Sequence, residues 1–370
     1  MGGGQRVTRY TLALCPGDGI GPEVVAEAVR ALRAVGDLFG YEFATSAYPI
    51  GAAALTRFGD PLPGFTRAAV TEANAVLLGA VGDPAFDSSP AELRPEAGLL
   101  ALRRHLAVYA NLRPVTPYPE LAAASPLRPE LLTGVDLLIV RELTGGLYYG
   151  EPRGRDETSA VNTLRYTASE VERVARVAFE AARLRRKRVT SVDKANVLEV
   201  SGLWREVVSR VGAEYPDVVL EHLYVDYAAM RLVSQPASFD VLVTENLFGD
   251  ILSDEAAVLA GSLGVLPSAS LGDGPGLFEP VHGSAPGLAG RGVANPIGAI
   301  GSAALLLRYG LGLNDAALLL EAAVQTVLRA GFRTRDLVGP GARWLGTREF
   351  AEQICQAVRS GATARSPAER

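Results

Sequence analysis

The stretch V-T-E-N-L-F-G-D-I-L-S-D, residues 243–254, constrains this chain more than any other. An apolar run over residues 239–243 predicts a strand, which stops at the polar T-E-N, and a helical pattern then continues to about Gly261. On that helix Asp250 and Asp254 are four residues apart, so their Cβ atoms lie on one face at about 5–6 Å. Either both carboxylates are solvated on an exposed face, or a hard cation such as Mg²⁺ or Mn²⁺ lies between them.

Composition excludes several classes of protein. With 370 residues, 48% of them hydrophobic and 21% charged, the chain is expected to be a soluble globular enzyme with two subdomains. A net charge of −5 gives no reason to expect nucleic acid or a membrane surface as partner. No apolar run reaches the roughly 18 residues of a membrane span, and the chain start lacks the apolar segment of a signal peptide. Cys15 and Cys355 have no metal or redox spacing, which favours a reducing cytoplasm.

Lysine is almost absent from the sequence. Lysine and arginine total 36, yet only Lys187 and Lys194 are lysines. Arginine keeps its proton in proteins, whereas lysine can lose it in a suitable environment. Lys187 lies in the basic run R-R-K-R, but Lys194 ends a predicted strand in S-V-D-K-A-N-V, which makes it the better candidate for a functional lysine.

Strands that alternate with helices predict an α/β fold with a parallel sheet covered on both faces. Several of these strands end in a polar or charged residue just before a helix, namely at Arg141, Lys194, Asp226 and Asn246. Ligands of open α/β sheets bind outside the carboxyl ends of the strands. We therefore expect these side chains to share one site.

Two further segments have distinctive patterns. The turn P-G-D-G-I-G-P, residues 16–22, opens a helix, but its G-x-G-x-G spacing does not fit the dinucleotide fingerprint G-x-G-x-x-G. It predicts a tight strand-to-helix turn near a ligand, outside a standard Rossmann fold. Residues 148–166 contain two β-like pieces around 151–156, which predict a protruding hairpin that pairs with another subunit.

The candidate residues form a consistent chemical set. Each acid or arginine alone is more typical of a surface or structural ion pair, and a loop histidine such as His282 is more often structural. Together, three carboxylates suit Mg²⁺ and three guanidinium groups suit carboxylates, which predicts a small polycarboxylate bound through a metal. Lys194 and Tyr148 remain as proton carriers. The acids are Asp226, Asp250 and Asp254, and the arginines are Arg103, Arg113 and Arg141.

With these motifs assembled, the chain resembles the β-decarboxylating dehydrogenases of the isocitrate/isopropylmalate dehydrogenase family, from about Leu12 to Val358. The resemblance is carried by L-C-P-G-D-G-I-G-P-E, R-P-E-A-G-L-L-A-L-R-R, A-N-L-R-P, R-E-L-T-G-G-L-Y-Y-G-E-P-R-G, S-V-D-K-A-N-V-L, N-L-F-G-D-I-L-S-D and F-E-P-V-H-G-S-A-P. It implies an α/β fold of two domains on a large twisted mixed sheet, distinct from a standard Rossmann fold. Residues 1–108 and 261–370 would form a discontinuous cofactor-binding domain, and 109–260 a dimerisation domain with the hairpin arm and most metal and substrate ligands.

The resemblance also implies roles for individual residues. Arg103, Arg113 and Arg141 would bind the malate carboxylates, and Asp250 and Asp254 would hold Mg²⁺ or Mn²⁺ together with Asp226 of the partner subunit. Lys194, also from the partner, would take the hydroxyl proton as hydride leaves for NAD⁺, and Tyr148 would help to protonate the enolate after CO₂ is lost. NAD⁺ would lie along residues 279–295. Its predicted contacts are Ile20, Glu96, Glu279, His282, Gly283, Ser284, Ala285 and Asn295.

Substrate choice within the family rests on a few side chains. Leu99 and Leu100, with Val197 opposite, would offer an apolar wall to the isopropyl group of 3-isopropylmalate. An unpaired third carboxylate against leucine would cost at least a few kcal/mol, which argues against isocitrate. Homoisocitrate-, isocitrate- and tartrate-type relatives usually read R-E-N-T-E-G where this chain reads R-E-L-T-G-G. They remain the alternative, and a catalytically silent ligand-binding subunit is a more distant one.

Position 287 departs from the family pattern. Members that use NAD⁺ usually have aspartate after H-G-S-A-P, where its carboxylate binds the adenosine ribose, and this chain has Gly287. Losing such a charged hydrogen bond weakens binding by about 1.5–3 kcal/mol. We predict that NAD⁺ is still preferred, but with a raised KM and a smaller margin over NADP⁺, and that Gly287→Asp sharpens the preference. Values of kcat/KM with both cofactors test this, and a clear NADP⁺ preference would contradict it.

Overall fold

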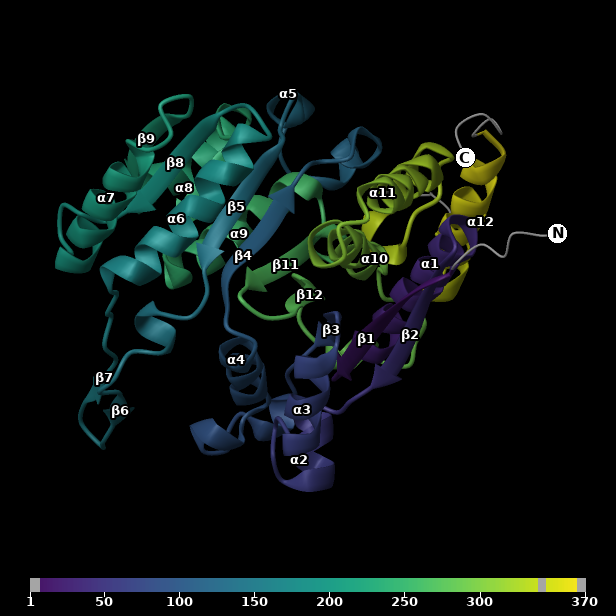
Figure 1. Ribbon diagram of the computed structural model, residues 1–370, viewed down its shortest axis with the longest axis horizontal. Helices are drawn as coiled ribbons and strands as arrows, with labels where there is room; N and C mark the ends of the chain where they lie inside the picture. The colour runs from purple at the N-terminus through teal and green to yellow at the C-terminus, as the bar shows by residue number, and fades with distance from the viewer. Residues whose placement is uncertain (1–6, 339–343, 365–370) are drawn as a thin grey trace. The chain divides into compact units, whose positions relative to one another are not determined.

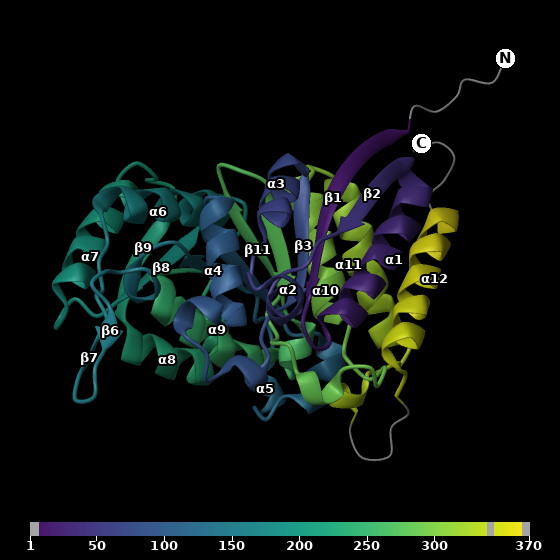
Figure 2. The same ribbon diagram turned by 90° about the horizontal axis from the view of Figure 1, so that it is seen from below.

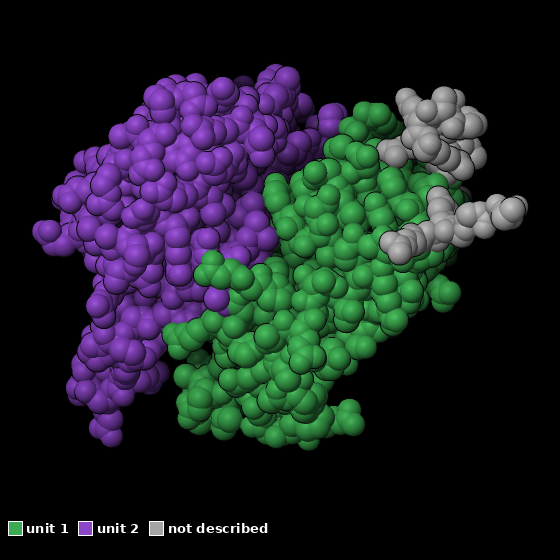
Figure 3. Space-filling model, in the orientation of Figure 1, with its two compact units in different colours: residues 1–106, 262–269, 273–370 green, residues 107–261, 270–272 purple. Residues whose placement is uncertain are grey.

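The structure is a computed structural model that describes residues 7–338 and 344–364. The chain divides into two compact units (Figure 3). Unit 1 comprises residues 1–106, 262–269 and 273–370, and unit 2 comprises residues 107–261 and 270–272. Most of unit 2 lies between the segments of unit 1 in the sequence, so unit 1 is built from segments that are distant along the chain.

Among the described residues, ten strands form one mixed sheet in the order β2-β1-β3-β12-β11-β4-β5-β10-β8-β9, which confirms the predicted fold class. β4 runs antiparallel to β5. The strand pairs β5–β10, β10–β8 and β8–β9 are all parallel. The strands are β1 (Thr8–Gly17), β2 (Tyr41–Ala47), β3 (Ala75–Ala80), β4 (Val108–Val115), β5 (Leu137–Glu142), β8 (Arg188–Asp193), β9 (Val219–Tyr224), β10 (Val241–Thr244), β11 (Pro267–Gly272) and β12 (Gly276–Pro280).

In unit 1, α1 and α10 lie against the strands, and α11 and α12 pack beside them (Figure 2). The apolar stripe of α1 faces inward, because Val24, Ala28, Leu32 and Val35 recur at helical spacing and are buried. The α-helices of this unit are α1 (Gly21–Phe39), α2 (Ala52–Phe58), α3 (Gly64–Glu72), α4 (Pro95–His105), α10 (Ile297–Leu305), α11 (Asn314–Arg329) and α12 (Thr347–Ala364).

In unit 2, α6 and α7 cover one face of the strands, and α8 and α9 cover the other (Figures 1 and 2). β5 and β10 are therefore buried along their whole length, which explains their continuous apolar runs. The α-helices of this unit are α5 (Pro129–Leu132), α6 (Ala168–Arg183), α7 (Glu199–Gly212), α8 (Val225–Ser234) and α9 (Asn246–Ala260).

The junction of β10 and α9 follows the sequence prediction closely. The Glu245 carboxylate accepts hydrogen bonds from the backbone N–H groups of Leu247 and Phe248, at 3.0 and 2.7 Å, and so caps the helix. Gly261 ends the helix with φ +86°, a left-handed conformation that favours glycine. The helix is thereby fixed at both ends, which sets the face on which Asp250 and Asp254 lie.

The predicted hairpin is present, but its turn lies further along the chain than expected. β6 (Gly154–Arg155) pairs antiparallel with β7 (Ala160–Val161). The turn between them is fixed by the Asp156 side chain, which accepts hydrogen bonds from the backbone N–H groups of Thr158 and Ser159 at 2.7 Å each.

No helix within residues 7–338 and 344–364 is long and apolar enough to cross a membrane.

Candidate active site

The carboxyl ends of four parallel strands in unit 2 carry the four residues that the sequence analysis assigned to strand ends. Arg141 is the last residue but one of β5, Asn246 begins the helix after β10, and Lys194 directly follows β8. Asp226 differs from the sequence prediction, which ended the strand at this residue. The helix α8 begins at Val225, directly after β9, so Asp226 lies in the first turn of a helix, where the helix dipole favours a carboxylate.

A buried guanidinium forms the centre of the site in unit 2. Arg141 is only 1% exposed. Its Nε and Nη2 donate to Asn246 Oδ1 at 3.1 and 2.6 Å, and its Nη1 donates to Asp250 Oδ1. Asn246 thus orients the guanidinium plane, and Asp250 compensates its charge.

Arg113 approaches the same carboxylate from β4. Its Nε donates to Asn111 Oδ1 at 2.7 Å, its Nη1 to Ser253 Oγ at 2.5 Å and its Nη2 to Asp250 Oδ1 at 3.5 Å. Asp254 Oδ1 lies 3.8 Å from Arg113 Nη1. The structure therefore brings two predicted arginines and two predicted aspartates together within unit 2.

Tyr148 belongs to the same cluster. It ends a 3₁₀ turn, Gly146–Tyr148, and its hydroxyl donates to Asp250 Oδ2 at 2.7 Å. Burial and the Asp250 carboxylate raise the pKa of Tyr148 to about 12. The phenol therefore holds its proton at neutral pH and is able to donate it, as the predicted role requires.

The two aspartates of α9 are suited to a divalent cation. Both present hard carboxylate oxygens, and the side chain of Asp254 is 64% exposed. Burial and, to a smaller extent, the like charge of Asp250 raise the pKa of Asp254, against the opposing effect of Arg113. A cation would relieve that repulsion. No group of three or more His, Cys, Asp or Glu suited to a metal occurs in the described part of the chain, so Asp226 does not complete such a set here.

Lys194 and Asp226 form a separate pair. The Lys194 Nζ donates to Asp226 Oδ1 at 2.6 Å and lies 6.0 Å from the centre of the Tyr224 ring. The Lys194 hydrogen bond lowers the pKa of the Asp226 carboxyl. The preceding Asp193 is buried and accepts from Arg205 Nε and Nη2, both at 2.9 Å. The backbone before the lysine is therefore held firmly.

In unit 1 the structure joins two residues that the sequence analysis assigned to different ligands. Arg103, a predicted substrate ligand on α4, donates through Nη2 to Oε1 of Glu279, a predicted cofactor ligand on β12, at 2.7 Å. Both side chains are buried. Leu99 is half-buried on α4, and Glu96 is exposed at the start of the same helix.

The glycine-rich turn contacts the predicted cofactor loop through the backbone. Ile20 N–H donates to the Ser284 carbonyl at 2.8 Å, and a Cβ on Gly19 would lie 1.9 Å from that oxygen. Gly19 has φ +57°, so glycine is required there for both reasons. Ala285 adopts φ +40°, an unusual conformation for a residue with a side chain, and one often found at ligand sites.

His282 supports a nucleotide in this loop. Burial lowers the pKa of its imidazole, which favours the neutral ring. Its Nδ1 lies 2.9 Å from the Gly283 carbonyl, which assigns the proton to Nδ1, and its buried Nε2 has no hydrogen-bond partner within residues 7–338 and 344–364. A ligand donor would satisfy this nitrogen. Asn295, in contrast, already donates to Asp336 at 3.0 Å and accepts from the backbone of Ile297 at 3.0 Å.

The position of Gly287 has open space around it. Among the described residues, no atom outside the neighbouring positions lies within 4 Å of a Cβ built there, so the site has room for the Cβ of a side chain. Arg291 Nη1 donates to the Gly287 carbonyl at 3.3 Å.

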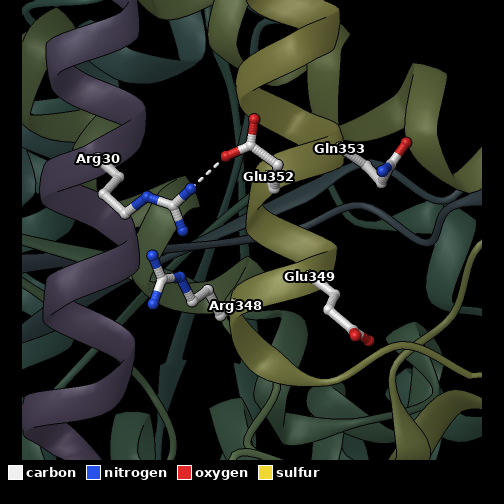
Figure 4. Close-up of a pocket in the computed structure, with 5 residues that line it drawn as sticks. All are labelled: Arg30, Arg348, Glu349, Glu352 and Gln353. Atoms are coloured by element: carbon white, nitrogen blue, oxygen red, sulfur yellow. Dashed lines mark hydrogen bonds and ion pairs between the residues drawn. The ribbon is translucent and has the colours of Figure 1, made fainter.

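A pocket between α1 and α12 of unit 1 holds none of the predicted site residues (Figure 4). It is lined by Arg30, Arg348, Glu349, Glu352 and Gln353. Arg30 donates to Glu27 at 2.6 Å and also pairs with Glu352. The pair with Glu352 joins α1 to α12, whereas Glu27 lies on α1 with Arg30.

Comparison with known proteins identifies the class to which this fold and site belong. A family model described as "Isocitrate/isopropylmalate dehydrogenase" matches residues 11–354. The chain belongs to this family of dehydrogenases, which confirms the resemblance.

The relatives of the chain include 3-isopropylmalate dehydrogenases and an isocitrate dehydrogenase of known structure. The chain is 56% identical to a 3-isopropylmalate dehydrogenase of Geobacillus kaustophilus, over 94% of this chain and 95% of that protein. It is 54% identical to one of Halalkalibacterium halodurans, over 94% and 98%. Among solved structures, an isocitrate dehydrogenase from Methylococcus capsulatus is 38% identical, with a TM-score of 0.84 over 95% of this chain and 99% of that one.

Sequence reasoning missed several residues that hold the site together. Asn246 was expected at the site as a residue at a strand end, but Ser253 was missed, although it lies three residues after Asp250, a spacing that places it near that aspartate on the helix. Asn111 lies two before Arg113 on a strand and so faces the same side. These spacings were the signals from which the missed residues could have been found in the sequence. Asp18, which accepts from the backbone N–H groups of Ala52, Ala53 and Gly82 at 2.9 Å each, had none.

The contact between Tyr148 and Asp250 gives a pH-dependent prediction. Replacing Asp250 with asparagine removes the negative charge that raises the Tyr148 pKa, so we expect this pKa to fall from about 12 toward the ordinary 10 while burial keeps it somewhat above that value. Ultraviolet difference titration of tyrosine ionisation in metal-free buffer measures the change. The same titration of Tyr148→Phe identifies the phenol responsible, and an Asp250→Asn curve that matches the unmodified protein would contradict the assignment.

Proposed function

We propose that the protein catalyses the oxidative decarboxylation of (2R,3S)-3-isopropylmalate to 4-methyl-2-oxopentanoate and CO₂ with reduction of NAD⁺, a reaction of leucine biosynthesis. The observation that carries the proposal is the hydrogen-bonded cluster of Arg141, Arg113, Asp250 and Tyr148, found in a chain 51–56% identical to proteins named 3-isopropylmalate dehydrogenase. The cluster combines carboxylate-binding cations, oxygen ligands for a metal and a protonated acid.

The substrate ligands are assigned by residue type. Arg103, Arg113 and Arg141 would bind the two carboxylates of the substrate, because guanidinium groups match carboxylate geometry. Leu99 would contact the isopropyl group. An apolar contact at this position disfavours the additional carboxylate of isocitrate.

The metal is assigned to Asp250 and Asp254, with Asp226 of a second copy of the chain as the third ligand. When bound, Mg²⁺ or Mn²⁺ would polarise the substrate oxygens and stabilise negative charge that develops on them. Asp250 would remain oriented by Arg141, Arg113 and Tyr148. The like-charge repulsion between Asp250 and Asp254 supports this assignment.

The proton transfers are assigned to Lys194 and Tyr148. As hydride passes from C2 of the substrate to NAD⁺, the Lys194 amine would take the proton of the C2 hydroxyl. The 2-oxo acid then loses its β-carboxylate as CO₂. Tyr148 would donate its hydroxyl proton to the resulting enolate carbon, and its raised pKa keeps that proton in place until then. Asp226 holds the lysine by hydrogen bond in the structure.

NAD⁺ is assigned to unit 1. The unpartnered Nε2 of His282 and the strained Ala285 support a nucleotide along the loop 282–285, and Ile20 is tied to that loop through Ser284. Glu96, Glu279, Gly283 and Asn295 complete the proposed contacts. The Arg103–Glu279 ion pair would connect the substrate ligands with the cofactor ligands.

A homodimer with shared active sites is part of the proposal. Large apolar side chains lie exposed on α8 and α9, on the same elements as Asp226 and Asp254. Exposed apolar surface of this kind marks interaction sites. A second copy that covers it would bring Asp226 and Lys194 of one subunit toward Asp250 and Asp254 of the other. The exposed side chains are Tyr227, Met230, Val233, Ile251 and Val258.

The proposed compartment is the cytoplasm, with which the free cysteines Cys15 and Cys355 are consistent.

The direct test of the function is NADH formation from 3-isopropylmalate by the purified protein with Mn²⁺ or Mg²⁺. We expect turnover, and its loss in EDTA with recovery on adding excess metal, because the substrate is bound through the cation. Isocitrate, homoisocitrate and tartrate serve as comparison substrates. Turnover that survives EDTA would contradict the metal assignment, and faster turnover of a comparison acid would contradict the substrate assignment.

The two lysines provide a matched pair of variants. Lys194→Met is expected to lower kcat by about 100- to 10,000-fold, the contribution of a general base, while the Kd for NAD⁺ stays nearly constant. Lys187→Met removes a lysine that pairs with Asp217 at 3.6 Å and should leave kcat unchanged. Steady-state kinetics and cofactor titration measure both effects.

The same variant tests whether the site is shared. Lys194→Met and Asp254→Asn chains would each be inactive alone. If Lys194 serves the partner's site, a mixed dimer contains one site with both changes and one with neither, and activity reappears on co-expression. Mixed dimers that stay inactive would show that each site is built from one chain.

A further inference from the structure

Tyr166 lies just before α6 and is 6% exposed. Its hydroxyl donates to Glu142 Oε2 at 3.0 Å and accepts the backbone N–H of Asn246 at 3.0 Å. Because Asn246 N–H is a donor, the single phenolic proton is directed to Glu142. One hydroxyl thus joins the end of β5 to the start of α9.

The first branch of this network fixes the segment that leads to Tyr148. Glu142 is fully buried, and its carboxylate accepts from Thr144 N at 2.9 Å, Thr144 Oγ1 at 2.8 Å and Gly145 N at 2.8 Å. The next residues form the turn Gly146–Tyr148. The direction of the Tyr148 side chain therefore depends on how Glu142 is held.

The second branch fixes the helix that carries Asp250. Asn246 is the first residue of α9, and besides the bond to Tyr166 its Nδ2 donates to the Gly145 carbonyl at 3.1 Å. Its Oδ1 accepts from Arg141 at 2.6 Å. A shift of Asn246 would therefore move both the guanidinium and the start of the helix.

The ring of Tyr166 constrains the same segment by its volume. A Cβ on Gly145 would lie 2.5 Å from Tyr166 Cε1, and a Cβ on Gly146 would lie 2.5 Å from the hydroxyl. Trp204 supports the ring edge-on, with the ring centres 5.7 Å apart. A glutamate at position 145, as in R-E-N-T-E-G, and a tyrosine at 166 therefore exclude each other in this arrangement.

We propose that Tyr166 is a positioning residue for the reaction, and that Gly145 and Tyr166 form a matched pair. Through one hydroxyl, Tyr166 sets the orientation of Tyr148 on one side and of Arg141 and Asp250 on the other. The inference rests on the proposed function for its effect on catalysis. The arrangement itself belongs to unit 2 alone and is testable without turnover.

The test compares Tyr166→Phe with Tyr215→Phe, since Tyr215 is also 6% exposed but stacks on Phe179. Losing one buried hydroxyl with a charged partner should lower kcat/KM for 3-isopropylmalate by about 10-fold, and the KM for NAD⁺ should not change. Hydrogen exchange should become faster in residues 143–150 and 245–248. Tyr215→Phe should show neither effect.

A second variant tests the matched pair. Gly145→Ala should lower kcat/KM by at least about 10-fold in the presence of Tyr166, because the new methyl group meets the ring, and by much less in a Tyr166→Leu background. Equal losses in the two backgrounds would overturn the pairing. Unchanged exchange in Tyr166→Phe, or a rise in the KM for NAD⁺ that parallels the loss of kcat/KM, would overturn the positioning role.

These outcomes are separable from a failure of the proposed function. If the unmodified protein does not oxidise 3-isopropylmalate, the proposed function fails, and hydrogen exchange alone then decides the role of Tyr166. If the unmodified protein turns over and Tyr166→Phe matches it in both kinetics and exchange, only the positioning role fails.

Discussion

The buried guanidinium of Arg141 is the interaction on which the site in unit 2 depends. A charge that is 1% exposed requires hydrogen-bonded partners, because an unpaired buried ion costs several kcal/mol. Asn246 and Asp250 supply them from successive turns of α9. Gly249 allows the close approach, since a Cβ there would lie 2.6 Å from Arg141 Cγ. In the motif N-L-F-G-D the first and last residues therefore bind the Arg141 guanidinium, and the glycine leaves room for the arginine side chain.

The sequence predicted the parts of this arrangement that follow from local spacing. The strand before α9, the helix end at Gly261 and the shared face of Asp250 and Asp254 all come from periodicity and helix-ending signals. The antiparallel direction of β4 does not, because strands that alternate with helices predict a parallel sheet. That direction sets Asn111 opposite Arg141 and so brings Arg113 to Asp250. Contacts of this kind depend on which residues of two different strands lie opposite each other, and the local spacing of residues in the sequence does not determine this.

Unit 1 shows how similar residue types acquire different roles. Asp18 in the glycine-rich turn binds three backbone N–H groups, which makes it a structural residue of that turn. Gly19 brings the backbone against Ser284, and one ring nitrogen of His282 has no hydrogen-bond partner in the part of the chain that the structure describes. The sequence identified the loop from its resemblance. Only the hydrogen bonds distinguish the polar groups that the fold has already used from those still available to a ligand.

The scarcity of lysine has a consequence for protein chemistry. Nearly every cation of the chain is an arginine, and arginines hold the buried carboxylates Asp193 and Asp240. Amine-directed reagents therefore meet only two lysine side chains, one paired with Asp217 and one with Asp226. Selective attachment of a spectroscopic label or an affinity probe at Lys194 therefore requires the removal of only one competing lysine, Lys187, which is the more exposed of the two.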